Sequence, residues 1–185
     1  MKLLTSLMLL VLVLAMPPAL RATTFTATLN GASEVPPSGS PATGFLTLTL
    51  SGNSLTVVET FSGLLGGAAA AAHIHCCAAA GSNAIVAIPF GGFPAATSGS
   101  YSPLAFDLTL SGTYNAAFIT AHGGTAALAE ADFLAAMYGG LTYANIHDAT
   151  FPGGEIRGQI GEVPEPATLF LSAASLLTLA LIRRR

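Results

Sequence analysis

The strongest constraint on this chain is an alternation of apolar and hydroxyl side chains with a period of two residues. Threonines alternate with apolar residues over residues 25–29 and again over residues 46–50. Because successive side chains of a β-strand point to opposite faces, both segments predict half-buried strands. Many short strands separated by turns such as Ser51-Gly52 and Ser111-Gly112 favour an all-β fold, an antiparallel β-sandwich. Further short β-type runs cover residues 55–61, 84–88, 106–110 and 116–120.

One segment departs from this pattern. Residues 126–138 are rich in alanine and also contain Leu128, Phe133 and Met137. Gly139-Gly140 follows directly, and glycine commonly ends helices. We therefore predict one short surface helix in the second half of the domain.

The domain also looks internally duplicated. The pentapeptide of residues 48–52 recurs at residues 108–112, and His73-Ile74-His75 has a counterpart in Asn145-Ile146-His147. On a strand, the first and third residues of each tripeptide point to the same side. If the two halves pair, His75 and His147 approach one another.

Three imidazoles, from His73, His75 and His147, would then converge on one surface. Such a set suits Zn²⁺ or Cu²⁺ as a cofactor. Asp148 and Glu155 are available as an oxygen ligand or as hydrogen-bond acceptors behind the histidines. The alternative is that these histidines only make hydrogen bonds within the fold.

The N-terminal end predicts export. Lys2 precedes an apolar run over residues 3–16, and small residues follow as far as Ala22. A basic start, a short apolar core and a small-residue exit are typical of a secretory signal peptide. We therefore predict a signal peptide over residues 1–22, handled by Sec-type export machinery, and a mature domain over residues 23–162. A retained N-terminal anchor is the alternative.

The C-terminal end combines three features: Val163-Pro164-Glu165-Pro166, an apolar stretch over residues 167–182, and Arg183-Arg184-Arg185. The arginines stay in the cytoplasm by the positive-inside rule, so the stretch predicts a transmembrane helix. In this order, residues 163–185 resemble the PEP-CTERM sorting signal. The resemblance implies transient anchoring in the membrane of a Gram-negative, exopolysaccharide-producing bacterium. Cleavage by an exosortase-like protease then releases the protein to the cell surface or extracellular matrix. A plain C-terminal membrane anchor is the alternative.

The charge of the domain excludes one class of partner. Arg157 is the only basic residue within residues 23–162, against eight acidic residues, which are all those of the chain except Glu165. Nucleic-acid binding needs a surface of lysine and arginine, so we exclude it. An unpaired buried charge is strongly destabilising. We therefore predict a structural ion pair between Arg157 and Glu34, whose neighbours Pro36-Pro37 would hold that loop rigid.

The two cysteines, Cys76 and Cys77, are adjacent in the chain. Cysteines of exported proteins usually pair, but neighbours in sequence bridge only with difficulty. Three interpretations stay open: two small buried residues, which we favour, a vicinal or intermolecular disulfide, or soft metal ligands beside the histidines.

Four segments together resemble the CHRD domain, a module first described in chordin and common in bacterial secreted proteins. They are residues 31–37, Ala72-His73-Ile74-His75, residues 143–147 and residues 152–160. Their order and spacing cover essentially the whole mature domain. Cys76-Cys77-Ala78 stands where the family usually has Gly-Pro-Ala-like residues, so we expect the loop after His75 to differ. The resemblance implies a secreted module and a fold, while the family brings no well-established activity.

We therefore expect an exported, non-enzymatic surface or matrix module, with an exopolysaccharide or a surface protein as partner. The sequence contains no Gly-x-Ser-x-Gly, phosphate-loop or His-Glu-x-x-His motif, and residues 23–162 contain no lysine. A metal-binding domain with buffering or metal-dependent redox activity is one alternative. A binding partner of secreted signalling proteins is another.

Overall fold

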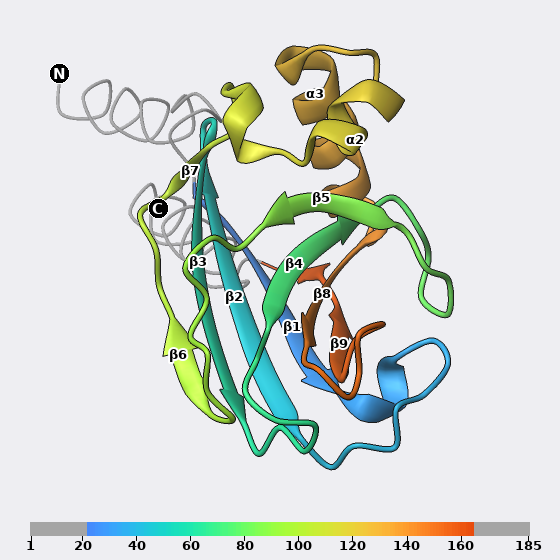
Figure 1. Cartoon of the computed structure of the whole chain (residues 1–185). Helices are drawn as coiled ribbons and strands as arrows, with labels where there is room; N and C mark the ends of the chain where they lie inside the picture. Colours follow the sequence, from blue (N-terminus) through green and yellow to red (C-terminus); the bar gives the residue numbers. More distant parts are fainter. Residues whose placement is uncertain (1–21, 165–185) are drawn as a thin grey trace, which may run out of the picture.

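The computed structural model describes residues 22–164, which form one curled antiparallel sheet of ten strands (Figure 1). The strands are β1 (Thr23–Asn30), β2 (Thr43–Ser51), β3 (Ser54–Ser62), β4 (Ala71–Cys76), β5 (Ile85–Pro89), β6 (Gly99–Tyr101), β7 (Phe106–Asp107), β8 (Thr142–His147), β9 (Ile156–Gln159) and β10 (Gly161–Glu162). They lie in the order β5-β4-β8-β9-β1-β2-β3-β6, with β10 beside β1 and β7 beside β3. Every pairing is antiparallel.

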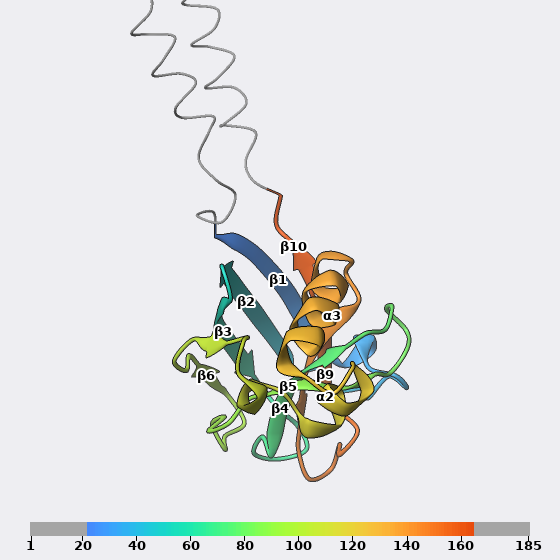
Figure 2. The same cartoon turned by 90° about the horizontal axis from the view of Figure 1, so that it is seen from above.

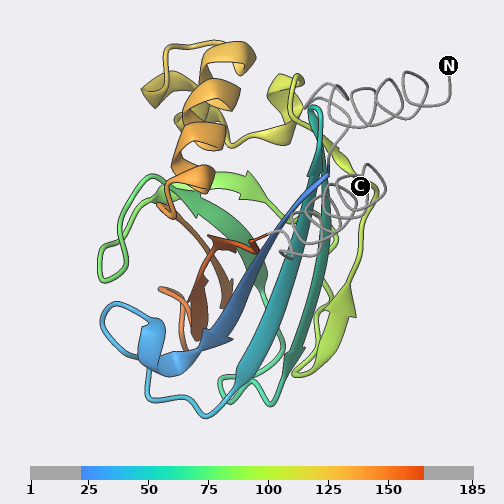
Figure 3. The same cartoon turned by 180° about the vertical axis from the view of Figure 1, so that it is seen from behind.

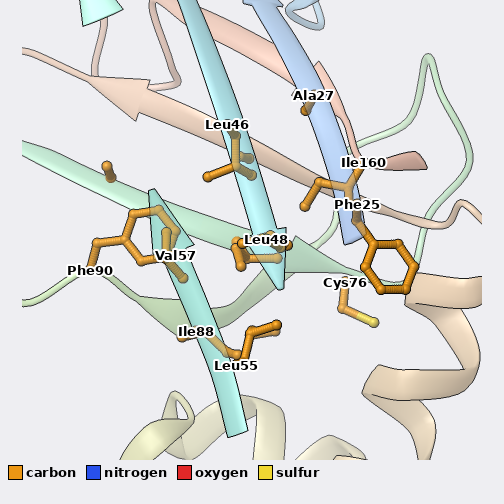
Figure 4. Packing of buried hydrophobic residues seen from close by; sticks show 14 of the residues in the cluster. Phe25, Ala27, Leu46, Leu48, Leu55, Val57, Cys76, Ile88, Phe90 and Ile160 are labelled. Atoms are coloured by element: carbon orange, nitrogen blue, oxygen red, sulfur yellow. The ribbon is translucent and has the colours of Figure 1, made fainter. Parts of the chain in front are cut away.

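Strands β1, β2 and β3 form one wall of the hydrophobic core. Along β3 every second side chain is buried and those between are exposed, as the alternation predicts. The β2–β3 register sets Leu48 opposite Val57, and both side chains belong to one hydrophobic core with Ile88 and Phe90 from the other half of the sheet (Figure 4). Burying one such side chain contributes roughly 1.5–3 kcal/mol. The predicted sandwich fits roughly, because a single sheet curls until its two halves face each other over the core.

The expected strand over residues 116–120 is wrong, because these residues form helix α2 (Ala116–Ala121). The Asn115 side chain accepts a hydrogen bond from the Ala117 N–H and caps the helix. Phe118 becomes fully buried beside Tyr114, with ring centres 5.8 Å apart. Six residues are too few to distinguish a period of two from a period of 3.6. Residues 22–164 therefore hold two α-helices instead of the predicted one.

The predicted helix of residues 126–138 is confirmed as α3 (Ala126–Tyr138). It begins after Thr125, whose hydroxyl accepts a hydrogen bond from the Leu128 N–H, and Gly139 follows its last residue. Helices α2 and α3 gather at one end of the sheet, beside β5 and β10 (Figures 1 and 2). They cover this end of the hydrophobic core.

The expected duplication does not extend to the secondary structure. Residues 48–52 lie at the end of β2 and in its turn, whereas residues 108–112 lead from β7 into the 3₁₀-helix η3 (Ser111–Thr113). A second 3₁₀-helix, η2 (Gly31–Ser33), follows β1. Only the two tripeptides that contain histidine correspond, because both lie on strands of the same sheet.

The predicted signal peptide and C-terminal sorting segment fall outside the described residues, apart from Ala22, Val163 and Pro164. Within residues 22–164, no helix combines the length and the apolar character needed to cross a membrane.

Glu59 occupies a position on β3 that faces the core, between Val57 and Phe61. The side chain is fully buried, and neither carboxylate oxygen has a hydrogen-bond partner among the described residues. Burial raises the pKa of Glu59 from its ordinary value of 4.5 to about 8. At neutral pH the folded protein therefore holds this carboxyl group in its protonated, neutral form.

We expect Glu59 to make stability depend on pH. The unfolded chain loses this proton near pH 4.5 and the folded chain only near pH 8, so the free energy of unfolding falls as the pH rises between these values. Glu59→Leu removes both the titration and the buried polar group. It should raise the free energy of unfolding at pH 8 by roughly 2–5 kcal/mol, measured by chemical denaturation.

The exposed Glu162 provides the control for this prediction, since Glu162→Leu leaves the buried carboxyl group of Glu59 in place and the loss of stability caused by Glu59 should persist. If Glu59→Leu lost stability between pH 5 and pH 8 as steeply as the wild type, the pH dependence of stability would not come from Glu59.

Candidate metal centre

Strands β4 and β8 pair directly and carry the candidate site on one face. Their register sets His73 opposite Asn145 and His75 opposite Tyr143. The alternate side chains, such as Ile74, belong to the hydrophobic core. The polar side chains of both strands therefore gather on the face that turns away from the core.

The three predicted histidines come together on this face. One side-chain nitrogen from each of His73, His75 and His147 lies within 4.8 Å of the other two. The ring centre of His147 lies 5.0 Å from that of His73 and 6.2 Å from that of His75. His75 is buried, and the other two rings are half-buried. The structure thus brings His75 towards His147 as the sequence predicts, while metal binding itself stays a prediction.

Backbone carbonyls fix the orientation of two rings. Nδ1 of His75 lies 2.9 Å from the oxygen of Ala84, and Nδ1 of His147 lies 2.9 Å from the oxygen of Pro152. A carbonyl oxygen can only accept, so in each ring Nδ1 carries the hydrogen and donates it. In a neutral ring Nε2 then holds a lone pair. Both Nε2 atoms face Asn145 Oδ1, at 3.0 Å from His75 and 2.9 Å from His147.

Burial keeps all three rings neutral. It lowers the pKa of His73 from 6.5 to about 4, with a further lowering by the neighbouring His147 and His75. Burial also lowers the pKa of His75 and that of His147. Nδ1 of His73 is buried and has no hydrogen-bond partner within residues 22–164. At neutral pH the cluster therefore presents nitrogen lone pairs with few hydrogens to satisfy them.

Arg157, the only basic residue among residues 22–164, is buried beside the cluster. Its guanidinium carbon lies 3.4 Å from the centre of the Tyr143 ring, which in turn stacks parallel to His75 at 4.6 Å. The guanidinium also donates to Asn83 Oδ1 at 3.0 Å and to the oxygen of Ser82 at 2.6 Å. Arg157 thereby holds both the tyrosine that packs on His75 and the loop whose Ala84 carbonyl orients that ring.

Glu34 is also buried in this region. Burial raises the pKa of Glu34 to about 7, while the charge of Arg157 and a hydrogen bond from the Asn145 side chain act in the opposite direction. No direct hydrogen bond or salt bridge between Glu34 and Arg157 occurs in residues 22–164, because the guanidinium is taken up by Asn83 and Ser82. The two predicted partners therefore attract each other at longer range.

Loops complete the site on the side of β8 and β9. The loop after β1 and the loop between β4 and β5 lie on this side of the sheet (Figure 3), and the Asn83 side chain joins them by donating to the oxygen of Val35 at 3.0 Å. Gly154 has a φ of 125°, and a Cβ added there would collide with Glu34 Oε1 and Asn145 Nδ2. The glycine-rich segment around Gly154 is therefore required for close approach to the site.

Asp148 and Glu155 do not belong to the histidine cluster. Asp148 Oδ1 accepts hydrogen bonds from the backbone of Thr150 and of Phe151, both at 2.8 Å. Glu155 Oε1 accepts from the Ser40 hydroxyl at 2.5 Å. Both buried carboxylates hold loops in place, and neither acts as the predicted ligand or acceptor behind the histidines.

Cys76 and Cys77 form a vicinal disulfide, with Cys76 buried and Cys77 exposed. The favoured interpretation as two small buried residues is therefore wrong, because Cys77 is exposed and the two sulfurs are bonded to each other. Neither sulfur is a thiolate that could ligate a metal. The disulfide stands at the start of the loop that ends at Ala84. The carbonyl oxygen of Ala84 accepts the hydrogen bond from Nδ1 of His75.

Comparison with protein families agrees with this arrangement. A model of the CHRD domain matches residues 25–160, a range that includes both histidine-bearing strands and the glycine-rich segment. The chain belongs to the CHRD domain family. CHRD domains occur in extracellular proteins, so membership is consistent with export. No curated protein and no solved structure matches the chain.

Two asparagines of this CHRD domain were not predicted as parts of the site. Asn145 lies two residues before His147, so the period of a strand already places both on one face and could have drawn attention to it. Asn83 lies in a loop, where no periodic pattern indicates which side chain turns inward.

We expect Arg157→Ala to lower the free energy of unfolding by roughly 3–5 kcal/mol. The change leaves the acceptors of Asn83 and Ser82 without a donor and removes the stack on Tyr143. Glu130→Ala removes one solvent-exposed hydrogen bond, which the Asn53 side chain donates at 2.8 Å, and should lower stability by about 1 kcal/mol or less. Denaturant titrations of the two variants measure the difference, and equal midpoints would show that Arg157 has no special structural role.

Proposed function

We propose that this CHRD protein is an exported surface or matrix module that holds a divalent d-block ion, zinc or copper, on His73, His75 and His147. The observation that carries the proposal is the convergence of three neutral imidazoles within 4.8 Å of one another. Imidazole nitrogen is a common ligand of both metals, and three histidines with a further ligand form a familiar zinc site.

A purely hydrogen-bonding role explains the cluster less well. Buried polar atoms normally find hydrogen-bond partners. Here Nδ1 of His73 has none among the described residues, and the Nε2 atoms of His75 and His147 face an amide oxygen. A cation in their midst would satisfy these lone pairs together. Backbone carbonyls behind the Nδ1 atoms are typical partners of histidines that bind metal through Nε2.

The charge of the domain also favours a cation. Eight acidic residues and one arginine lie within residues 23–162, so the surrounding field attracts positive ions. The positive charge of Arg157 opposes this attraction near the histidines. The guanidinium packs on the ring of Tyr143, and this ring stacks on His75. Glu34, when ionised, adds a negative charge on the same side of the sheet.

We propose a non-enzymatic role for the module. The chain lacks the common catalytic motifs and has no lysine in the domain, and the disulfide leaves no thiolate nucleophile among the described residues. Metal-dependent redox activity remains the alternative if the bound ion is copper. A dismutase assay of the metal-loaded protein separates the two.

Export and sorting form the second part of the proposal. Residues 1–22 would be the signal peptide for Sec-type export, and residues 163–185 the sorting signal cut by an exosortase-like protease after transient anchoring by the apolar helix. The disulfide between Cys76 and Cys77 supports an oxidising compartment. The processed protein would then reach the cell surface or the extracellular matrix.

An exopolysaccharide or a surface protein is the proposed partner. The outward face of β1, β2 and β3 consists of hydroxyl and amide side chains, with Phe45 and Val58 exposed among them and no charged side chain. Thr24, Thr49 and Thr56 form one of the rows across these strands. Such a face supports contact with an uncharged polymer by hydrogen bonds and by stacking on the aromatic ring.

Metal content tests the metal-binding part of the proposal. The full chain, exported under its own signal and purified without chelator or affinity tag, should carry close to one zinc or copper ion per molecule by elemental mass spectrometry. A double variant, His75→Ala with His147→Ala, should lose the ion because it removes two of the three ligands. His122→Ala should keep it, because His122 pairs with Asp132 at 2.8 Å and lies outside the cluster.

A wild-type protein that is free of metal and takes up neither zinc nor copper would contradict metal binding. Retention of the ion in the double variant would move the binding site elsewhere in the chain.

A further inference from the structure

We infer that Asn145 is the fourth ligand of the histidine site, and that its amide oxygen closes the coordination sphere of the ion. The inference rests on the proposed function, since it names a residue of that same site. With four protein ligands, no coordination position on the metal remains for water or a substrate. The site would therefore hold the ion without binding a substrate to it.

Asn145 lies at the centre of the cluster. It stands opposite His73 in the β4–β8 pairing and two residues before His147 on β8. Only 2% of its surface is exposed, and Oδ1 lies 3.0 Å from Nε2 of His75 and 2.9 Å from Nε2 of His147. A single atom of Asn145 therefore touches both of the rings that are fixed in orientation.

These short contacts join atoms that all accept. The single hydrogen of each neutral ring is donated from Nδ1, by His75 to Ala84 and by His147 to Pro152. Two nitrogen lone pairs and an amide oxygen then face one another without a hydrogen between them. Like partial charges at 3 Å repel in a buried site, and a cation at their centre turns the repulsion into coordination.

The distances suit a tetrahedral ion. Bonds of about 2.0–2.1 Å from zinc to nitrogen or oxygen place neighbouring ligand atoms about 3.3 Å apart. The contacts of Asn145 Oδ1 are slightly shorter than this edge, whereas the histidine nitrogens lie within 4.8 Å of one another. Binding therefore requires a small outward movement of the amide and a closing of the rings around the ion. His73 supplies the third nitrogen from the directly opposite position on β4.

The far side of the amide fixes which atom faces the histidines. Oδ1 of Asn145 lies against the rings of His75 and His147, so Nδ2 points away from them, towards Gly154 and the Glu34 carboxylate. Gly154 leaves room for this contact, because a Cβ there would meet both Nδ2 of Asn145 and Oε1 of Glu34. Glu34 and Gly154 therefore position the ligand atom without binding the metal.

Cobalt substitution with azide as a probe tests this inference. The full-length wild type, Asn145→Ala and the control Asn53→Ala are loaded with Co²⁺, and visible absorption is recorded with and without azide. Azide binds cobalt only where a coordination position is open or is held by water. We expect azide to leave the wild-type and Asn53→Ala spectra unchanged. It should change that of Asn145→Ala, whose cobalt affinity should fall roughly 10-fold or more.

The other outcomes have distinct meanings. Azide-sensitive cobalt in the wild type would show an open position and would overturn the inference, whether or not Asn145→Ala folds. Equal cobalt affinity and equal azide response in wild type and Asn145→Ala would also overturn it, and would leave the three-histidine site standing. A wild type that binds no cobalt, zinc or copper would reject the proposed function itself.

Discussion

The antiparallel pairing of β4 with β8 is the constraint on which the rest of the structure depends. Its register sets His73 opposite Asn145, and alternation then sends Ile74 and Ile146 into the core. A shift of one residue would turn every side chain of a strand to the other face. The hydrophobic core and the candidate metal centre are therefore two faces of one pair of strands, and neither forms correctly without the other.

Burial of polar groups on the second face gives the site its character. Arg157, Glu34 and Asn145 are all nearly inaccessible to solvent. The guanidinium of Arg157 donates to Asn83 and to the backbone of Ser82, whereas Glu34 Oε1 has no hydrogen-bond partner among the described residues. Such a cluster is costly for stability. Burial also shifts the pKa values of Glu34 and of the three neighbouring histidines, and buried groups with shifted pKa values are characteristic of functional sites. Glu59 differs, because it lies among apolar side chains in the core and its carboxyl group has no hydrogen-bond partner within residues 22–164.

The sequence predicts those strands and helices whose apolar residues recur every two residues or every 3.6 residues. Alternation identified β1, β2 and β3, the alanine-rich run gave α3, and the two histidine tripeptides were placed on strands of one sheet. The prediction of a strand over residues 116–120 was wrong, because helix α2 has only six residues, too few to show a repeat of 3.6 residues. The contacts of Asn83 and Ser82 with Arg157 come from a loop, whose path depends on tertiary packing and leaves no local pattern. The vicinal disulfide likewise depends on local backbone geometry that composition does not indicate.

We propose that the neutral imidazoles of β4 and β8 bind a metal ion. The most direct measurement is anomalous X-ray diffraction from crystals of protein purified without chelator, with data collected at the zinc and copper absorption edges. We expect one strong anomalous peak, bonded to His73, His75, His147 and the Asn145 oxygen. A featureless map at both edges in zinc- and copper-soaked crystals, or a peak at His122 alone, would contradict it.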